Sequence, residues 1–183
     1  MGSLYDYRTI VVGTDGSPLA APTVARAAWL AAHDDADLII VCAYSALSRR
    51  QEARNPATLG GDARIGQVPG RTAASSAIAA AVAVAQEQSA TIAAALLIDG
   101  EPATALLASA KERAADLIVV GALRDTGLAD RLLGTVATEV VRRAPCEVLV
   151  VRPRAAEQEG AQQEAAGRET EPVARDGVLH ANS

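Results

Sequence analysis

The amino-acid sequence predicts an α/β fold with an open sheet of five parallel strands and helices on both faces. Five short apolar runs alternate along the chain with segments of helical periodicity, an order typical of parallel βαβ units with right-handed crossovers. The runs are nearly continuous in Val, Ile and Leu, as expected of strands that are covered on both faces. Five strands are too few to close a parallel barrel, so the sheet is expected to be open.

The strands are predicted from apolar runs that polar or turn-forming residues bound. In chain order they are Arg8–Gly13, Asp37–Ala43, Thr91–Ile98, Asp116–Val120 and Cys146–Val151.

The first helix is predicted to begin at Ser17 and Pro18, because a hydroxyl cap is followed there by proline at the first helical position. Its expected apolar face consists of Ala21, Val24, Ala25 and Ala28.

Three further helices are expected between and after the later strands. The second is an alanine-rich segment from about Thr72 to Gln88. The third starts near Pro102 and should turn Leu106, Leu107 and Ala110 inward, and the fourth follows Thr135 over Val136–Arg143.

Size and composition restrict the function classes. The 183 residues suit one domain with an additional tail, and the absence of Phe implies an aliphatic core. A net charge of −5 argues against a nucleic-acid partner. No apolar run approaches the length of a membrane span and the N-terminus lacks secretory features, so we expect a cytoplasmic protein without a membrane partner.

The cysteines and histidines do not form a recognisable metal or redox motif. Cys42 and Cys146 lie in strand-like runs, and we expect them to be small buried hydrophobic residues in a reducing compartment. His33 and His180 have no companions at ligand spacing, so no metal site is expected.

Two segments lie outside the strand and helix pattern of the domain, which we assign to residues 1–153. Segment 45–71 carries five arginines against two acidic residues and is expected to be a flexible basic loop that can fold over a neighbouring site. Residues 154–183 are expected to be a disordered acidic tail, because they lack periodic apolar positions.

The segment from Gly121 to Thr135 is suited to hold an anion. The fourth strand ends in Gly121, and after a loop the chain enters a helix through Gly134 and Thr135. Glycine lets the backbone approach a ligand, the first amides of a helix point free N–H groups at it, and Thr135 adds a hydroxyl. A phosphate-bearing ligand is therefore indicated.

A second loop, Val12–Ser17, follows the first strand. If the first and fourth strands are neighbours, both loops line one crevice at the carboxyl edge of the sheet. Asp15 could then accept hydrogen bonds from sugar hydroxyls or an amine, while Gly134 and Thr135 hold phosphates. Taken alone, Asp15 is better explained as a turn or cap residue than as a ligand contact, and Gly134 with Thr135 as an ordinary helix start.

Four separated motifs, in this order, resemble the universal stress protein family. They are Ile10–Ser17, Gly100–Ala103, Ala115–Gly121 and Pro145–Pro153, so that the similarity covers about residues 7 to 153. The resemblance implies a sheet of order 3-2-1-4-5 of the adenine nucleotide alpha hydrolase-like type, in which the first and fourth strands are neighbours. It also implies a role in stress response and a homodimer, often formed through the last strand.

One branch of that family binds ATP or other adenine nucleotides through the pattern Gly-x2-Gly-x9-Gly-(Ser/Thr). Gly121, Gly134 and Thr135 match it, whereas Arg124 occupies the position of the second glycine. The resemblance implies ribose contacts for Asp15 and backbone near the adenine from Ala43. The whole implied nucleotide site comprises Gly13, Thr14, Asp15, Ala43, Val120, Gly121, Arg124, Gly134, Thr135, Val136 and Ala137.

Arg124 leaves two hypotheses open. A side chain there hinders the close approach that glycine allows, but a guanidinium is well suited to bidentate phosphate contacts. The first hypothesis is a dimer that binds ATP, AMP or cyclic AMP, with or without Mg²⁺, as a regulator or sink. The alternative is a nucleotide-free dimer that acts as an interaction partner.

Dedicated catalysis is not expected. The sequence shows no Ser-His-Asp set, no lysine–carboxylate pair and no Walker-type Gly-Lys-Thr to activate a nucleophile or a γ-phosphate. Slow hydrolysis of bound ATP is the most that we expect.

Overall fold

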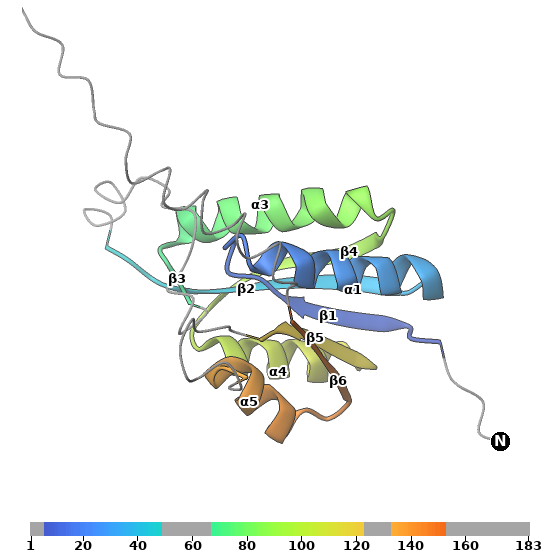
Figure 1. The fold of residues 1–183 in the computed structure, drawn as a ribbon. Coiled ribbons are helices and arrows are strands. Elements are labelled where there is room, and N and C mark those ends of the chain that lie inside the picture. Colours follow the sequence, from blue (N-terminus) through green and yellow to red (C-terminus); the bar gives the residue numbers. More distant parts are fainter. Residues whose placement is uncertain (1–5, 49–66, 123–132, 153–183) are drawn as a thin grey trace, which may run out of the picture. The chain divides into compact units, whose positions relative to one another are not determined.

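The computed structural model describes residues 6–48, 67–122 and 133–152 of the chain. Strands and helices alternate along these residues, as the sequence predicts (Figure 1). The strands are β1 (Thr9–Gly13), β2 (Asp37–Ser45), β3 (Val68–Pro69), β4 (Thr91–Asp99), β5 (Leu117–Gly121) and β6 (Glu147–Val151). The helices are α1 (Ala20–Asp34), α3 (Arg71–Glu87), α4 (Pro102–Glu112) and α5 (Thr135–Arg143).

All strand pairs of the sheet are parallel, and the five predicted strands lie in the predicted order. β1 pairs with β2 and with β5, β4 pairs with the other side of β2, and β6 pairs with β5. The order β4-β2-β1-β5-β6 is the expected 3-2-1-4-5.

The short strand β3 is a sixth strand, which the sequence pattern does not predict. Val68 and Pro69 pair with Tyr44 and Ser45 at the end of β2. They fall inside segment 45–71, which was expected to be a loop throughout. Two residues are too few to show a hydrophobic period, so only the pairing with β2 identifies them. Residues 49–66 of that segment lie outside the described part of the chain.

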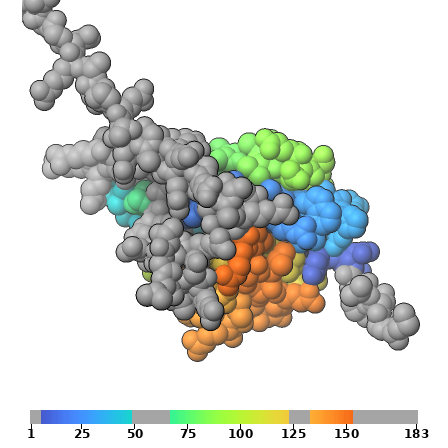
Figure 2. Space-filling view, viewed as in Figure 1, coloured from blue at the N-terminus to red at the C-terminus, as the bar shows by residue number. Residues whose placement is uncertain are grey.

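Helices cover both faces of the sheet. Figure 1 shows α1 and α3 on one face and α4 and α5 on the other, and α1 contacts α3 as α4 contacts α5. In the space-filling view, α3 (green) lies above α1 (blue), and the orange C-terminal segment lies below them (Figure 2). The prediction of helices on both faces is therefore confirmed.

The central strands are buried on both sides by aliphatic side chains. Ile10 and Val12 pack with α1 and α3, whereas Val11, between them, packs with α4 and α5. Successive strand residues point to opposite faces, so a strand with two covered faces needs apolar residues at every position. This explains the continuous apolar runs in the sequence.

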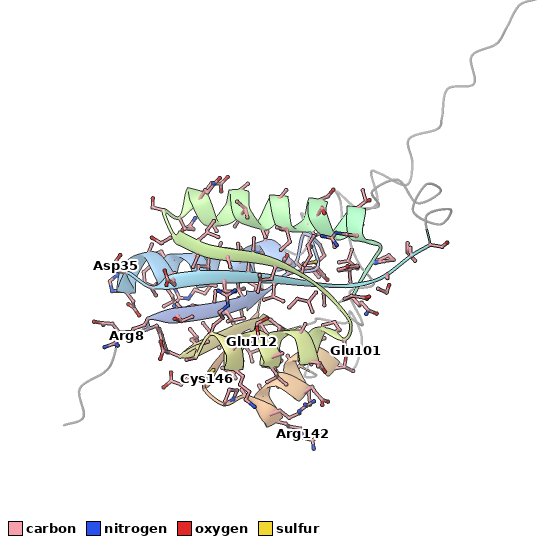
Figure 3. All side chains as sticks on the ribbon, turned by 180° about the vertical axis from the view of Figure 1, so that it is seen from behind. Arg8, Asp35, Glu101, Glu112, Arg142 and Cys146 are labelled. Carbon is pink, nitrogen blue, oxygen red and sulfur yellow. The ribbon has the colours of Figure 1, made fainter. Side chains whose placement is uncertain are left out.

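A carboxylate fixes the start of β1 against β5. Asp116 Oδ2 accepts hydrogen bonds from the backbone N–H groups of Arg8 (2.8 Å) and Thr9 (3.0 Å). The pairing that follows sets Ile10 opposite Leu117. Arg8 and Asp35 mark this amino end of the layers, and Glu101, before α4, lies at the carboxyl end (Figure 3).

The predicted start of the first helix is wrong. α1 begins at Ala20 with Leu19 as its N-cap residue, and no side chain caps it. Ser17 instead belongs to a turn in which its N–H donates to Asp15 Oδ1 at 2.9 Å, and its carbonyl accepts from Ala20 N at 2.9 Å. The turn preference of Asp15 thus outweighs the capping preference of Ser17.

The apolar faces of the helices were predicted in part. Val24 and Ala28 of α1 are buried, but the expected Ala21 and Ala25 are only half-buried. The buried stripe contains Thr23, Ala27 and Ala31 instead, because α3 packs along that side of α1.

The other predicted elements need small corrections. In α4, Leu106 and Ala110 are buried as expected, while Leu107 is half-buried. The last strand starts at Glu147, one residue after the predicted Cys146.

The two cysteines are free thiols. Cys42 is fully buried, and this burial, with a smaller effect from the charge of Asp15, raises the pKa of its thiol to about 12. Cys42 therefore has the hydrophobic role that was predicted. Cys146 is only half-buried, and burial again is the main cause that raises the pKa of its thiol.

Two further findings concern membranes and metals. No helix among the described residues is long and apolar enough to cross a membrane. The described residues also contain no group of three or more His, Cys, Asp or Glu side chains that could hold a metal ion.

Gly16 generates a prediction about stability. Its φ is +72°, and a Cβ placed on it would lie 2.6 Å from the Cβ of Ala77 in α3. We expect Gly16→Ala to lower the free energy of unfolding by about 2–4 kcal/mol, from left-handed strain plus overpacking. Urea unfolding measures this. In an Ala77→Gly background the loss should be smaller, and an equal loss in both backgrounds would contradict the packing explanation.

Candidate functional site

A cavity opens at the carboxyl edge of the sheet, between the ends of β1 and β5. It has about 740 Å³ of space, counting the open solvent at its mouth. β1 continues into α1 on one face of the sheet, and the chain after β5 returns to α5 on the other. Open parallel sheets bind their ligands at such a point, where the connections of two neighbouring strands lie on opposite faces of the sheet.

Most residues of the implied nucleotide site line this cavity. They are Gly13, Thr14, Asp15, Ala43, Val120, Gly121, Gly134, Val136 and Ala137. Thr135 is the first residue of α5 but is not among the lining residues. Arg124 lies outside the described part of the chain.

Backbone pairing brings Asp15 to the rim of the sheet. Gly13, the last residue of β1, is in register with Val41 of β2, and Thr14 N donates to the Val41 carbonyl at 2.9 Å. Asp15 is therefore the first residue to leave the sheet. Its Oδ1 accepts from Ser17 N at 2.9 Å, yet the residue also lines the cavity, so its turn role and a ligand role are compatible.

Three helices present their N-terminal ends to the cavity. Leu19 and Ala20 of the α1 start, Pro102 of α4 and Gly134 before α5 are lining residues. None of these helices has an acidic residue in its first turn. The positive ends of the helix dipoles therefore favour an anion in this space.

Gly134 directs α5 toward the cavity. It is the N-cap residue of that helix, with φ of +79°, a value that glycine adopts without strain. Gly134, Val136 and Ala137 line the cavity, so the N-terminal end of α5 borders it.

Charged side chains contribute little to the lining. Asp15 is the only charged residue among the lining residues that the structure describes. An anion would therefore be held there by backbone amides and hydroxyls, at a distance from the Asp15 carboxylate. The remaining wall is largely apolar and includes Val41, Ala43 and Leu106, which suits a flat apolar group.

Several lining residues lie outside the two loops that were expected at the crevice. They are Leu19, Ala20, Thr23, Val41, Pro102 and Leu106. Val41 could have been inferred, because strand alignment sets it opposite Gly13. Thr23 gave no such signal, because the predicted apolar face of the first helix did not include it. Leu106 lines the cavity only because α4 packs below the end of β1, which no local pattern shows.

Thr23 and Gly121 fit together closely. Thr23 is 1% exposed, and its Oγ1 has no hydrogen-bond partner among the described residues. A Cβ on Gly121 would lie 2.9 Å from that oxygen. The motif explains this glycine by the approach of a ligand, but in the structure the Thr23 hydroxyl already occupies the space of a side chain.

Comparisons with known proteins agree with this architecture. A profile of the universal stress protein family matches residues 6–152. The universal stress protein Rv1636 of Mycobacterium tuberculosis strain H37Rv is 39% identical over 145 residues, which are 79% of this chain and 96% of that protein.

Solved structures of the same family superimpose on the chain. A universal stress protein in complex with cAMP is 32% identical, with a TM-score of 0.60 over 81% of this chain and 99% of that chain. One from Archaeoglobus fulgidus in complex with dAMP is 20% identical and shows the same fold, with a TM-score of 0.56 over 79% of this chain and 98% of its own.

The contact between Gly121 and Thr23 can be tested by mutation. We expect Gly121→Ala to lower the free energy of unfolding by about 1–3 kcal/mol, because the new methyl group would overlap the Thr23 hydroxyl. Chemical denaturation without ligand measures the loss. The same substitution in a Thr23→Ala background should cost less, and equal costs would show that another neighbour constrains Gly121.

Proposed function

The chain belongs to the universal stress protein family, and from that premise we propose that it binds an adenine nucleotide in the cavity between β1 and β5. The bound nucleotide would make the protein a regulator or a sink in stress response. The observation that carries this proposal is the pairing, in one cavity, of the Asp15 carboxylate with the Gly134-headed N-terminus of α5.

The cavity offers a suitable partner for each part of a nucleotide. The Asp15 carboxylate can accept hydrogen bonds from the ribose hydroxyls, which are donors. The apolar wall at Val41 and Ala43 can pack against the base. The phosphates are then left to the helix N-termini, whose amides and dipoles favour negative charge.

The candidates for the nucleotide are ATP, AMP and cyclic AMP. The 32% identical relative in complex with cAMP supports an adenine nucleotide as the class of ligand. The chain itself offers little to a Mg²⁺ ion, because Asp15 is the only carboxylate among the described lining residues. A metal accompanying ATP would therefore depend mainly on the phosphates for its ligands.

We propose binding rather than catalysis as the function. The described lining residues include no His, Lys or Cys that could serve as base or nucleophile. Asp15 alone could orient a water molecule, which would allow slow hydrolysis of ATP at most.

We also propose a homodimer formed through β6. Among the strands of the described residues, β6 pairs with β5 alone and lies at the edge of the sheet, and Val148 to Val151 are only half-buried. An apolar edge strand with free backbone groups is a template for pairing with a second chain. Native mass spectrometry would report the dimer mass together with any nucleotide that copurifies.

The proposed site predicts a specific response to charge removal. We expect the protein to bind at least one of ATP, AMP and cyclic AMP, and Asp15→Asn to weaken that binding about tenfold or more. Isothermal titration calorimetry measures both. Asp37→Asn, at the exposed start of β2 on the opposite edge, is the matched control and should leave affinity unchanged. Absence of binding at millimolar nucleotide would end the proposal.

Substitution of Arg124 can distinguish nucleotide binding from the alternative, a nucleotide-free interaction partner. That alternative is favoured by the arginine at the second glycine position of the motif. We expect wild-type protein to bind nucleotide and Arg124→Gly to weaken ATP binding, because a guanidinium–phosphate contact is lost. If binding is absent in the wild type and appears only in Arg124→Gly, the nucleotide-free function is established instead.

A further inference from the structure

Thr23 is a polar residue in the cavity that the motif does not include. It occupies the first turn of α1, is 1% exposed and lines the cavity. Its Oγ1 is the only buried side-chain N or O atom without a hydrogen-bond partner among the described residues. A buried hydroxyl without a partner costs free energy, and valine would fill the same volume without that cost. We therefore expect a bound ligand to supply the hydrogen-bond partner of this hydroxyl.

We infer that the Thr23 hydroxyl donates a hydrogen bond to a phosphate oxygen of the bound nucleotide. The inference rests on the proposed function and adds to it a phosphate contact from the α1 side of the cavity.

The surroundings of Thr23 favour an anion over a sugar. The N-terminus of α1 faces the cavity, and its first turn carries no acidic residue and no side-chain cap. Pro22 removes one backbone N–H that this turn would otherwise present. The Thr23 hydroxyl supplies a donor at the same helix end, where the dipole favours negative charge.

Gly121 leaves room for this hydroxyl. The site of a Cβ on Gly121 is 2.9 Å from Thr23 Oγ1, so the side chain of any other residue would overlap the oxygen. A glycine at the end of β5 thus keeps a side chain out of the space beside this donor, which is itself buried.

Titration of AMP and adenosine into wild type, Thr23→Val and Thr23→Ser tests the inference. We expect Thr23→Val to weaken AMP binding about tenfold and to leave adenosine binding unchanged, since only AMP carries the phosphate. Thr23→Ser keeps the hydroxyl and should bind AMP within about threefold of wild type. Thr104→Val, an exposed position on α4, is the matched control and should behave as wild type.

The outcomes separate this inference from the proposed function. If wild type binds neither AMP nor another adenine nucleotide, the proposed function fails and the inference fails with it. If wild type and Thr23→Val bind AMP equally, the inference alone is overturned. A parallel loss for adenosine and AMP would assign the hydroxyl to the nucleoside and also overturn it. Without ligand, Thr23→Val should melt no lower than wild type, which excludes misfolding as the cause of weaker binding.

Discussion

The parallel pairing of β1 between β2 and β5 is the constraint on which the rest of the molecule depends. Asp116 fixes its start through the amides of Arg8 and Thr9, and the pairs that follow bring Gly13 and Val41 to the same edge. With both faces of β1 covered by helices, a shift of register by one residue would exchange the side chains of the two cores. The register of β1 therefore fixes the position of the loops that follow it.

The cavity is a consequence of this arrangement. The chain leaves β1 toward one face and returns after β5 on the other, so none of the described helices fills the space between the two strand ends. Helix N-termini surround that space, while Asp15 provides its only charged side chain among the described residues. A ligand with a polyhydroxy part and an anionic part matches this polarity, which is why a nucleotide is the best-supported ligand.

The packing of Thr23 in α1 depends on Gly121 at the end of β5. Glycine at 121 is needed for the hydroxyl to fit, and the hydroxyl has no partner among the described residues. In our proposals a phosphate oxygen of the nucleotide supplies that partner. In these proposals the Thr23 hydroxyl lowers the stability of the ligand-free protein and raises its affinity for the nucleotide.

The sequence by itself determined the five long strands, their parallel order and the two loops that carry Asp15 and Gly134. Continuous apolar runs and glycine-bounded turns are local signals, and the family motifs placed them in order. Only the tertiary structure decided the start of α1, the short strand β3 and the role of Thr23. The strand β3 and the role of Thr23 depend on contacts between residues far apart in the chain, such as Thr23 with Gly121, and a local pattern carries no record of them. The start of α1 depends on the competition between two neighbouring residues, Asp15 and Ser17, which their local preferences alone do not decide.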